Sequence, residues 1–334
     1  MRFLVVPLLC CLLLTGCGRS EAPRTAARSL LVMHTVASLM AEGPGAEAAV
    51  EESAARLKEL ELRLDPDLPT SDIARLNAAA GIEPVTLSPE VYHLLAVSQE
   101  YSIRTEGAWD VTVGPLSRLW REALEKKELP DNEAVARAQA RVDCWKLELL
   151  PNGQAMLSEP GMVVDPGGAA KGLALDEVRR IYARHGVKSG LISLGESSVY
   201  ALGKKADGES WQIALRHPRQ PLPARLGRLP LTNAALANSG DYEQFVDVDG
   251  TRFHHILDPF TGWPVMNGTA AVAFLVSGEN PDAGLIADIL STALFVMGPE
   301  KGLPFLETLP FPSDAVFADT AGKVRTTAGF SLAP

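Results

Sequence analysis

Residues 285–297 read LIADILSTALFVM, and Asp288 is the only charged residue in this stretch. A helix that is apolar on nearly every side is a buried helix, so the stretch predicts a core helix that the rest of the fold must cover. Burying an unpaired carboxylate costs several kcal/mol or forces it to take up a proton. We therefore expect a cation or a strong hydrogen-bond donor to face Asp288.

Hydroxyl groups accompany Asp288 on the same side of this helix. Residues four apart share a helix face, so Thr292 should lie next to Asp288, with Ser291 on nearly the same face. Hard oxygen atoms that converge on one point are ligands suited to Mg²⁺. The segment alone leaves a second interpretation open, in which Asp288 pairs with an arginine or accepts backbone hydrogen bonds.

The 334-residue chain has the composition of an ordinary globular protein, with 46% hydrophobic and 22% charged residues. No linker rich in proline, glycine or serine divides it after residue 30, so residues 31–334 are predicted to form one compact catalytic unit, single or bilobed. The net charge of -10 and the lack of basic runs argue against nucleic acid as a partner. An anionic ligand would therefore need a metal, a lysine or a helix N-terminus.

The N-terminus has the pattern of an exported lipoprotein. Arg2 precedes an apolar run from Phe3 to Leu14, which is too short for a membrane-spanning helix of ~20 residues and fits the core of a signal peptide. The ending Leu-Thr-Gly-Cys at residues 14–17 resembles the bacterial lipoprotein signal. We predict a signal peptide over residues 1–16, lipid attachment at Cys17 and a tether over residues 17–30. Only Cys144 then remains, so no intramolecular disulfide can form.

Hydrophobic periodicity and turn residues predict helices and strands in an irregular order. The predicted helices cover residues 46–64, 88–103, 132–140 and 173–185. The predicted strands cover residues 190–194, 198–202, 211–215 and 269–276, with hairpins over 245–253 and 315–330. Because helices and strands do not alternate regularly, we expect an α+β fold with mixed or antiparallel sheets and flanking helices rather than a doubly wound parallel sheet.

A second segment with a chemical signature is DPGGAAKG, residues 165–172. It follows a short apolar strand and opens the helix predicted from Leu173, so its small residues would let a ligand approach the backbone. The helix N-terminus offers unpaired N–H groups to phosphate, and Lys171 adds a positive charge. The segment matches neither a Walker A loop nor a G-x-G-x-x-G fingerprint, and a tight strand-to-helix turn explains the glycines equally well.

Two further segments carry polar side chains at the ends of predicted strands. His255 and Asp258 are spaced so that the carboxylate would orient the imidazole for work as a general base. His254 and His255 would point to opposite faces of a strand, so only one can serve a site, and a purely structural histidine is the alternative. Ser239 lies in no G-x-S-x-G elbow and is interpreted as a ligand or turn residue.

These segments, in this order, resemble the FAD:protein FMN transferase family, long called thiamine-biosynthesis lipoproteins. The resemblance covers about residues 31–330 and is carried by several modest motifs in register. They are residues 71–77, 107–116 with Leu119 and Trp120, 165–172 with Asp176, 194–195, 239–242, 255–259 with Thr261 and Gly262, and 287–298.

The resemblance implies a lipoprotein that faces the bacterial periplasm, is anchored in the membrane by its lipid, and uses Mg²⁺ and FAD. It would transfer FMN to a Thr or Ser hydroxyl of a recipient flavoprotein, for example a subunit of a membrane redox complex, and release AMP. The recipient motif of the family is Asp-Gly-x-Ser/Thr-Gly-Ala-Thr.

The resemblance also implies roles for residues of this chain. Asp288, Thr292 and the carbonyl of Gly168 would hold the metal, assisted by Ser291. His255 would be the base, oriented by Asp258. The FAD site would be lined by Met33, Ala108, Trp109, Asp110, Asp165, Lys171 and the backbone at Ile256.

The chain departs from the family pattern at three places. The family usually has Met-Gly-Thr where this chain has Met33-His34-Thr35, and a second glycine where Glu196 follows Gly195. It also usually has an aromatic residue near Ser71 that packs on the flavin, and residues 64–69 contain none. Trp109 is the candidate to replace it.

Two other functions are compatible with the same residues. FAD hydrolysis to FMN and AMP would use water in place of the recipient hydroxyl. A lipoprotein that only binds flavin would explain the missing aromatic residue, but it would have little use for a metal at the diphosphate. An exported α+β lipoprotein without any ligand would leave the motifs unexplained.

Overall fold

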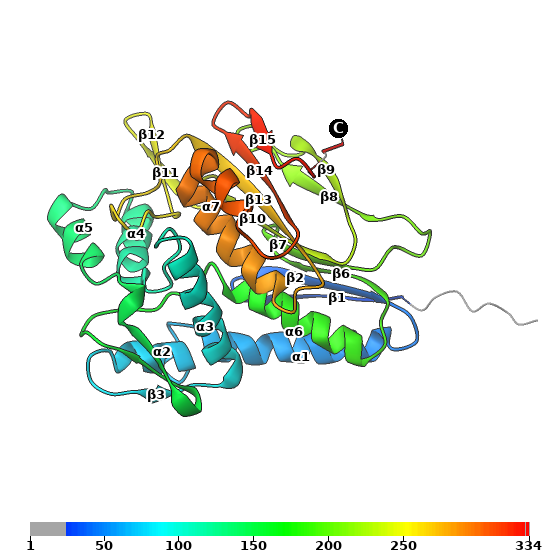
Figure 1. Ribbon diagram of the computed structural model, residues 1–334, viewed down its shortest axis with the longest axis horizontal. Coiled ribbons are helices and arrows are strands. Elements are labelled where there is room, and N and C mark those ends of the chain that lie inside the picture. The colour runs from blue at the N-terminus through cyan, green and yellow to red at the C-terminus, as the bar shows by residue number, and fades with distance from the viewer. Residues whose placement is uncertain (1–24, 331, 334) are drawn as a thin grey trace, which may run out of the picture.

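The computed structural model describes residues 25–330, 332 and 333 (Figure 1). The predicted signal peptide and Cys17 lie outside the described residues. The centre of the molecule is an eight-stranded antiparallel sheet. In spatial order its strands are β1 (Thr25–Val32), β2 (Thr35–Glu42), β6 (Ser189–Leu194), β7 (Ser198–Leu202), β10 (Ala234–Gly240), β13 (Thr269–Ser277), β14 (Ser313–Asp319) and β15 (Val324–Thr326).

Both faces of the sheet are buried at its centre. Helices α6 (Ala170–Arg184) and α7 (Ala283–Leu306) pack against one face, and α1 (Ala46–Leu64) lies beside α6 and the β1–β2 hairpin (Figure 1). The hairpin of β8 (Trp211–Arg216) and β9 (Arg225–Leu231) covers the other face. Alternate residues of a strand point to opposite faces, and β10 follows this rule: Ala235 faces the helices and Leu236 the β8–β9 hairpin.

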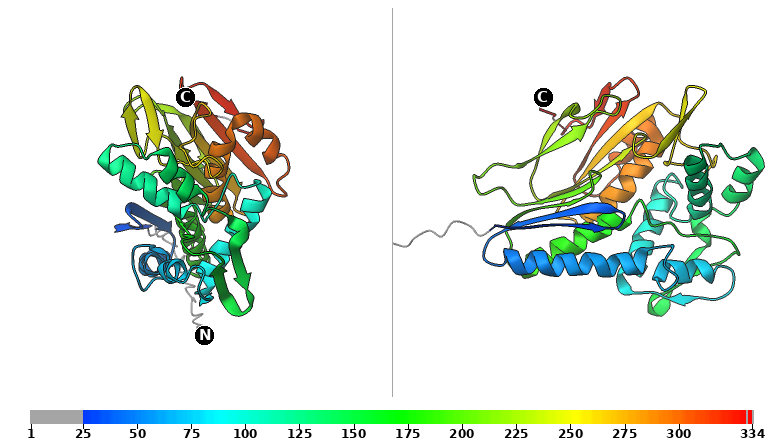
Figure 2. Two further views of the ribbon diagram at one scale, coloured as in Figure 1. Left: turned by 90° about the vertical axis from the view of Figure 1, so that its left-hand side faces the viewer. Right: turned by 180° about the vertical axis from the view of Figure 1, so that it is seen from behind.

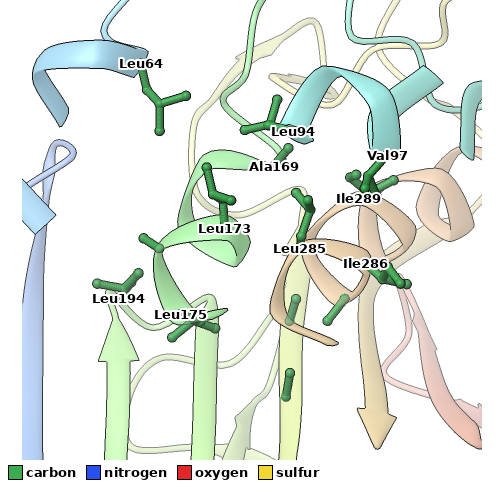
Figure 3. Close-up of a cluster of buried hydrophobic side chains, with 14 of the residues drawn as sticks. Leu64, Leu94, Val97, Ala169, Leu173, Leu175, Leu194, Leu285, Ile286 and Ile289 are labelled. Atoms are coloured by element: carbon green, nitrogen blue, oxygen red, sulfur yellow. The ribbon is translucent and has the colours of Figure 1, made fainter. Parts of the chain in front are cut away.

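A second group of elements, seen at the opposite end of the molecule from the β8–β9 hairpin (Figures 1 and 2), packs against the helical face. It contains α2 (Asp72–Ala78), α3 (Pro89–Arg104), α4 (Gly114–Lys126) and α5 (Asn132–Gln139), with the small sheet of β3 (Val85–Thr86), β5 (Gln154–Leu157) and β4 (Leu147–Leu150). Two short 3₁₀ turns, η1 (Cys144–Lys146) and η2 (Pro151–Gly153), flank β4. In one continuous core, Val97 of α3 lies beside Ile289 of α7, and Leu94 lies beside Ala169 at the start of α6 (Figure 3).

The hairpin of β11 (Phe245–Val248) and β12 (Thr251–His254) projects between the two groups (Figure 1). Aromatic side chains fasten it to α4: the ring centroids of Trp120 and Trp263 lie 5.2 Å apart, and Trp120 stacks on Phe253 at 6.1 Å. The indole N–H of Trp120 donates to the carbonyl of Gly262 at 2.8 Å. The segment that carries His254 and His255 is therefore held by both parts of the fold.

The predicted α+β fold with antiparallel sheets is confirmed, and most predicted elements are present. The helix predicted over 46–64 has the same bounds in the structure, and the other helices agree within a few residues. The helix predicted from Leu173 begins at Ala170, so Lys171 and Gly172 lie in its first turn rather than before it. Ser239 lies in a central strand and not in a turn.

The tether predicted over residues 17–30 is wrong from Thr25 onward. Residues 25–30 form most of β1, which pairs with β2 along its whole length. The side chains of β1 alternate between exposed and half-buried, which is the pattern of a strand with one solvated face. This short polar alternation resembled a linker because few of its residues are large and apolar.

Helix α7 is the core helix that the first stretch predicted. It is long and apolar enough to cross a membrane by length and composition, yet most of it is buried inside the protein. Gly298 interrupts it with a φ of 68°, and the side-chain amide of Asn267 donates to the freed carbonyls of Phe295 and Val296 at 3.0 and 3.1 Å. At its other end, the carboxylate of Asp176 accepts the N–H groups of Gly284 and Leu285 at 3.0 and 2.9 Å.

Candidate active site

Asp288 lies in the second turn of α7 with 5% of its surface exposed. One carboxylate oxygen accepts the N–H of Gly172 at 2.8 Å, and the other accepts the hydroxyl of Ser198 at 2.8 Å. No arginine or lysine within residues 25–330 forms an ion pair with it. Burial raises the pKa of Asp288, while the nearby charge of Lys171 and these hydrogen bonds lower it. The sequence left two interpretations of Asp288 open, a metal ligand or an acceptor of an arginine or of backbone hydrogen bonds. The structure shows one such backbone hydrogen bond, from Gly172.

Ser198 was not identified from the sequence. It lies 90 positions from Asp288 in the chain, at the start of a buried strand, and it is itself fully buried. A hydroxyl at the first position of an apolar strand was the only sequence signal for it.

A cluster of hydroxyl groups surrounds the next turn of α7. Ser239 Oγ lies 2.9 Å from Ser291 Oγ and 3.3 Å from Thr292 Oγ1. Ser291 also donates to the carbonyl of Asp288 at 2.9 Å. Gly168 lies directly beside them, because a Cβ atom placed on it would be 3.4 Å from Thr292 Oγ1. The structure therefore brings together the four residues predicted to hold a metal: Gly168, Asp288, Ser291 and Thr292.

This oxygen set fits a hard cation that a substrate helps to hold. The described part of the chain contains no group of three or more His, Cys, Asp or Glu side chains that could hold a metal by themselves. Mg²⁺ commonly binds through one or two carboxylates together with substrate phosphates and water. One buried carboxylate, several hydroxyls and a backbone carbonyl match that mode.

The 165–172 segment turns tightly from a β-bridge at Val163 into α6. Asp165 accepts the N–H of Gly167 at 2.9 Å and so stabilises its own turn. The N–H of Gly172, one of the groups expected to be free for phosphate, is occupied by Asp288. Lys171 lies in the first turn of α6, and its charge acts on both Asp288 and His255. Lys171 is thus the cation of this site.

Trp109 packs edge-on against Gly168, where a Cβ atom would come within 2.8 Å of its ring. Its indole N–H is buried and has no hydrogen-bond partner among the described residues, which is unusual for a buried donor. Ala108 is buried next to it. Because Trp109 is buried, it offers no open face to a flavin. The exposed aromatic ring nearby belongs to Phe260, which lies over Gly107.

The side chain of Asp110 joins its own segment to the turn at Cys144. Its carboxylate accepts the N–H and the hydroxyl of Thr112, both at 2.7 Å, and the N–H of Cys144 at 3.0 Å. Burial raises the pKa of Asp110, and these bonds oppose the rise. All the hydrogen bonds of this carboxylate in the structure are to the chain itself, and the expectation that Asp110 lines an FAD site stays a prediction.

Met33 lies in the turn between β1 and β2, and its N–H donates to Glu61 at 2.6 Å. Met33 and His34 both have left-handed backbone, with φ of 51° and 57°. His34 occupies the position where the resemblance leads us to expect glycine, and a positive φ is the backbone conformation that glycine adopts most readily. Gly195 touches Thr35, so this turn lies at the same end of the sheet as the Gly195–Glu196 turn.

His254 and His255 have different environments, as the strand geometry predicts. The buried ring of His254 is bonded on both sides: Nε2 lies 2.9 Å from the carbonyl of Val265, and Nδ1 accepts the N–H of Ile256 at 3.2 Å. Since a carbonyl only accepts, Nε2 carries the proton. His254 is thus the structural histidine. Ile256 also accepts from Val265 at 3.0 Å, so both of its backbone groups already serve the fold.

The side chain of His255 is exposed to solvent, although many protein atoms lie around it. Those surroundings lower the pKa of His255 to about 4, and the neighbouring charges of His254 and Lys171 add to the effect. The imidazole is therefore neutral near pH 7, the form in which it can accept a proton.

Asp258 does not orient His255. Its carboxylate accepts the N–H of Phe260 at 2.8 Å, and its backbone N–H donates to Trp263 at 2.9 Å. No hydrogen bond joins it to the imidazole within the described chain. The predicted pair is corrected, because the side chain is used two residues further on to close the 258–263 turn.

Comparisons with known proteins point in one direction. A model of the ApbE family matches residues 33–317. The FAD:protein FMN transferase of Treponema pallidum is 30% identical over 341 residues, which covers 96% of this chain and 92% of the relative. One from Klebsiella pneumoniae is 34% identical over 234 residues and covers 70% of each chain.

Solved structures give the same result. The ApbE protein of Thermotoga maritima superimposes with a TM-score of 0.82 at 26% identity, covering 91% of this chain and 97% of that one. The flavin transferase ApbE of Vibrio cholerae has a TM-score of 0.80 at 26% identity, covering 92% and 99%.

Proposed function

The chain belongs to the ApbE family and is an FAD:protein FMN transferase, and from this premise we propose that it moves FMN from FAD to a Ser or Thr hydroxyl of a recipient flavoprotein, with Mg²⁺ as cofactor and AMP as the second product. The observation that carries the proposal is that a buried carboxylate, Asp288, lies under the charge of Lys171 and is followed on the same helix by the clustered hydroxyls of Ser291 and Thr292. The diphosphate of FAD requires such a combination of a metal-ligating carboxylate and a cation.

In this proposal one group of residues would hold the metal ion and Lys171 would interact with the diphosphate directly. Asp288, Thr292 and the carbonyl of Gly168 would hold Mg²⁺, which when bound neutralises phosphate oxygens and makes the phosphorus easier to attack. Lys171 attracts the diphosphate and stabilises negative charge on the leaving AMP.

The chemical step balances without any further reactant. The recipient oxygen forms a bond to the phosphorus on the FMN side, and the bond from that phosphorus to the bridging oxygen of AMP breaks. The hydroxyl proton goes to His255, which is neutral beforehand. An anionic diphosphate close to the imidazole would raise its pKa from the low value of the free enzyme, so the base becomes stronger when substrate is bound.

The test is a transfer assay with the full-length chain in detergent. We expect a flavoprotein domain that carries the Asp-Gly-x-Thr-Gly-Ala-Thr motif to gain one FMN when FAD and Mg²⁺ are present, with one AMP formed per FMN attached. EDTA should stop both reactions and excess Mg²⁺ should restore them.

The control is the same domain with its recipient threonine replaced by alanine, which should remain unlabelled. AMP formation that continues at the full rate with this control would instead support FAD hydrolysis, for which the solvent access of His255 provides a route. Labelling that is unaffected by EDTA would count against Mg²⁺.

We also propose that the protein is a lipid-anchored membrane protein facing the periplasm. The support is the sequence of residues 1–17, with its short apolar run and Leu-Thr-Gly-Cys ending. Labelled palmitate should be incorporated into the wild-type chain and not into a Cys17→Ser variant. Equal labelling of the two would contradict the proposal.

A further inference from the structure

A cleft of about 460 Å³ opens between the β11–β12 hairpin and the ends of β13 and β14. None of the residues assigned above to Mg²⁺ or FAD lines it. Side chains from several parts of the chain do, among them Arg219, Asp241, Arg252, His254, Met266 and Thr269.

The wall of this cleft is an ordered polar surface. The guanidinium of Arg219 donates two hydrogen bonds to the carboxylate of Asp241, at 2.6 and 2.5 Å, and Asp241 is buried. Thr269 is only 6% exposed, and its hydroxyl has no partner among the described residues. Buried hydroxyls are almost always hydrogen-bonded, so Thr269 is a group that a bound ligand could satisfy.

The rim of the cleft exposes apolar surface. Met266 is 56% exposed, and Phe245 is 40% exposed with the guanidinium of Arg252 3.6 Å from its ring centre. Met, Arg and aromatic residues are enriched in protein–protein interfaces, and an exposed apolar patch with a polar border is typical of such surfaces.

The charges of the cleft distinguish it from the nucleotide site. Arg219 is paired with Asp241, and Arg252 with Asp247 at 3.2 Å, so each cation is balanced by an acid. Such a surface has no net positive charge to attract a dinucleotide. It suits a polypeptide segment, which offers backbone donors and acceptors and side chains of both signs.

The cleft is adjacent to the proposed base. His254 lines it, and the next residue is His255. Asp241, which pairs with Arg219 there, follows Ser239 and Gly240 at the end of β10, and Ser239 belongs to the hydroxyl cluster of the active site. The charge of Asp241 also acts on His255. Because His254 and His255 point to opposite sides, a chain seated in the cleft would have to pass the end of β12 to present a side chain to His255.

From these observations we infer that the cleft is the docking site for the recipient flavoprotein, which inserts the segment next to its modified hydroxyl. The inference rests on the proposed function, because that reaction has a protein as its second substrate and FAD is held elsewhere. Thr269 would bond to the inserted backbone, and Met266 and Phe245 would contact apolar side chains around it.

The test measures binding separately from transfer. The probe is a flavoprotein domain with the motif Asp-Gly-x-Thr-Gly-Ala-Thr whose recipient threonine is replaced by alanine, titrated against the full-length chain in detergent. We expect the double variant Met266→Ser, Arg252→Ala to bind this probe about tenfold more weakly than the wild type does, because it removes an apolar contact and an arginine contact together. The Kd for FAD should stay within about twofold.

A matched control removes one exposed apolar side chain and one ion-paired arginine elsewhere. Ile82 is 72% exposed in the loop after α2, and Arg184 pairs with Glu52 at 2.6 Å on the far end of α6. The variant Ile82→Ser, Arg184→Ala should bind the probe as the wild type does.

Each outcome decides the inference. Wild-type affinity in the cleft variant, an equal loss in the control variant, or no binding of the probe to the wild-type chain would overturn it. Normal binding of the probe combined with failure to label the unmodified domain would leave the docking site standing and refute the proposed function instead.

Discussion

Replacing Asp288 by alanine is expected to lower the rate of FMN transfer by about a thousandfold or more, because in the proposed site this side chain is the carboxylate that would hold Mg²⁺. The variant also leaves the N–H of Gly172 and the hydroxyl of Ser198 without their partner. The measurement is single-turnover labelling of the recipient domain, followed by mass spectrometry. Mn²⁺ binding, followed by electron paramagnetic resonance with FAD present, should be lost in parallel.

The variant Asp288→Asn, measured in the same experiment, removes the negative charge of the side chain and keeps its shape. The amide can still accept one hydrogen bond, so the fold should be kept, while the affinity for a dication falls. Asp282→Asn is the matched control, because Asp282 lies at the beginning of the same helix and pairs with His93 at 2.9 Å, away from the hydroxyl cluster. Transfer by Asp288→Asn at a rate similar to that of Asp282→Asn would remove the basis for the metal site.

Replacing His255 by glutamine is expected to lower the transfer rate by roughly a hundredfold or more, the usual contribution of a general base. The Kd for FAD should change little. The pH dependence of the wild type follows from the lowered pKa of about 4. Because of this lowered pKa, the imidazole stays neutral down to acidic pH. The contribution of His255 to kcat/KM should therefore be constant above about pH 5, and kcat/KM should fall at lower pH as the imidazole becomes protonated.

The pH dependence of kcat reports the enzyme with substrate bound. If the diphosphate raises the pKa of His255, the acidic decline of kcat should lie at higher pH than that of kcat/KM. Both acidic limbs should disappear in His255→Gln. His185→Gln is the control, because His185 pairs with Glu52 at 2.6 Å at the far end of α6, and its profile should match the wild type. An unchanged acidic limb in His255→Gln would assign the base to another group.

The fold could be predicted largely from local patterns, and the site only in part. The long amphipathic helix at 46–64 and the apolar stretch at 285–297 are strong signals, and both are found where expected. Helix α4 was not predicted, since it begins with Gly114 and Pro115. The partner of Asp288 in β7 could not be predicted, because a contact between residues 90 positions apart leaves no local pattern.

The aspartates that the motifs suggested as site residues show most clearly what the sequence could not predict. Asp110, Asp165 and Asp258 each accept the N–H of the residue two positions further on, which is the common use of aspartate in turns. Asp288 lies within a helix, where no such local bond is available, and both of its oxygens turn to other elements. An aspartate in an apolar helix is therefore a stronger functional signal than one in a loop.

The position of β1 at the border of the sheet has a practical consequence for anyone who shortens this protein. A version that started at residue 31, after the supposed tether, would delete nearly all of β1, which pairs with β2 through all eight of its residues. The amide and carbonyl groups of β2 would then be bare along one side, a template for self-association. Soluble versions should begin ahead of Thr25.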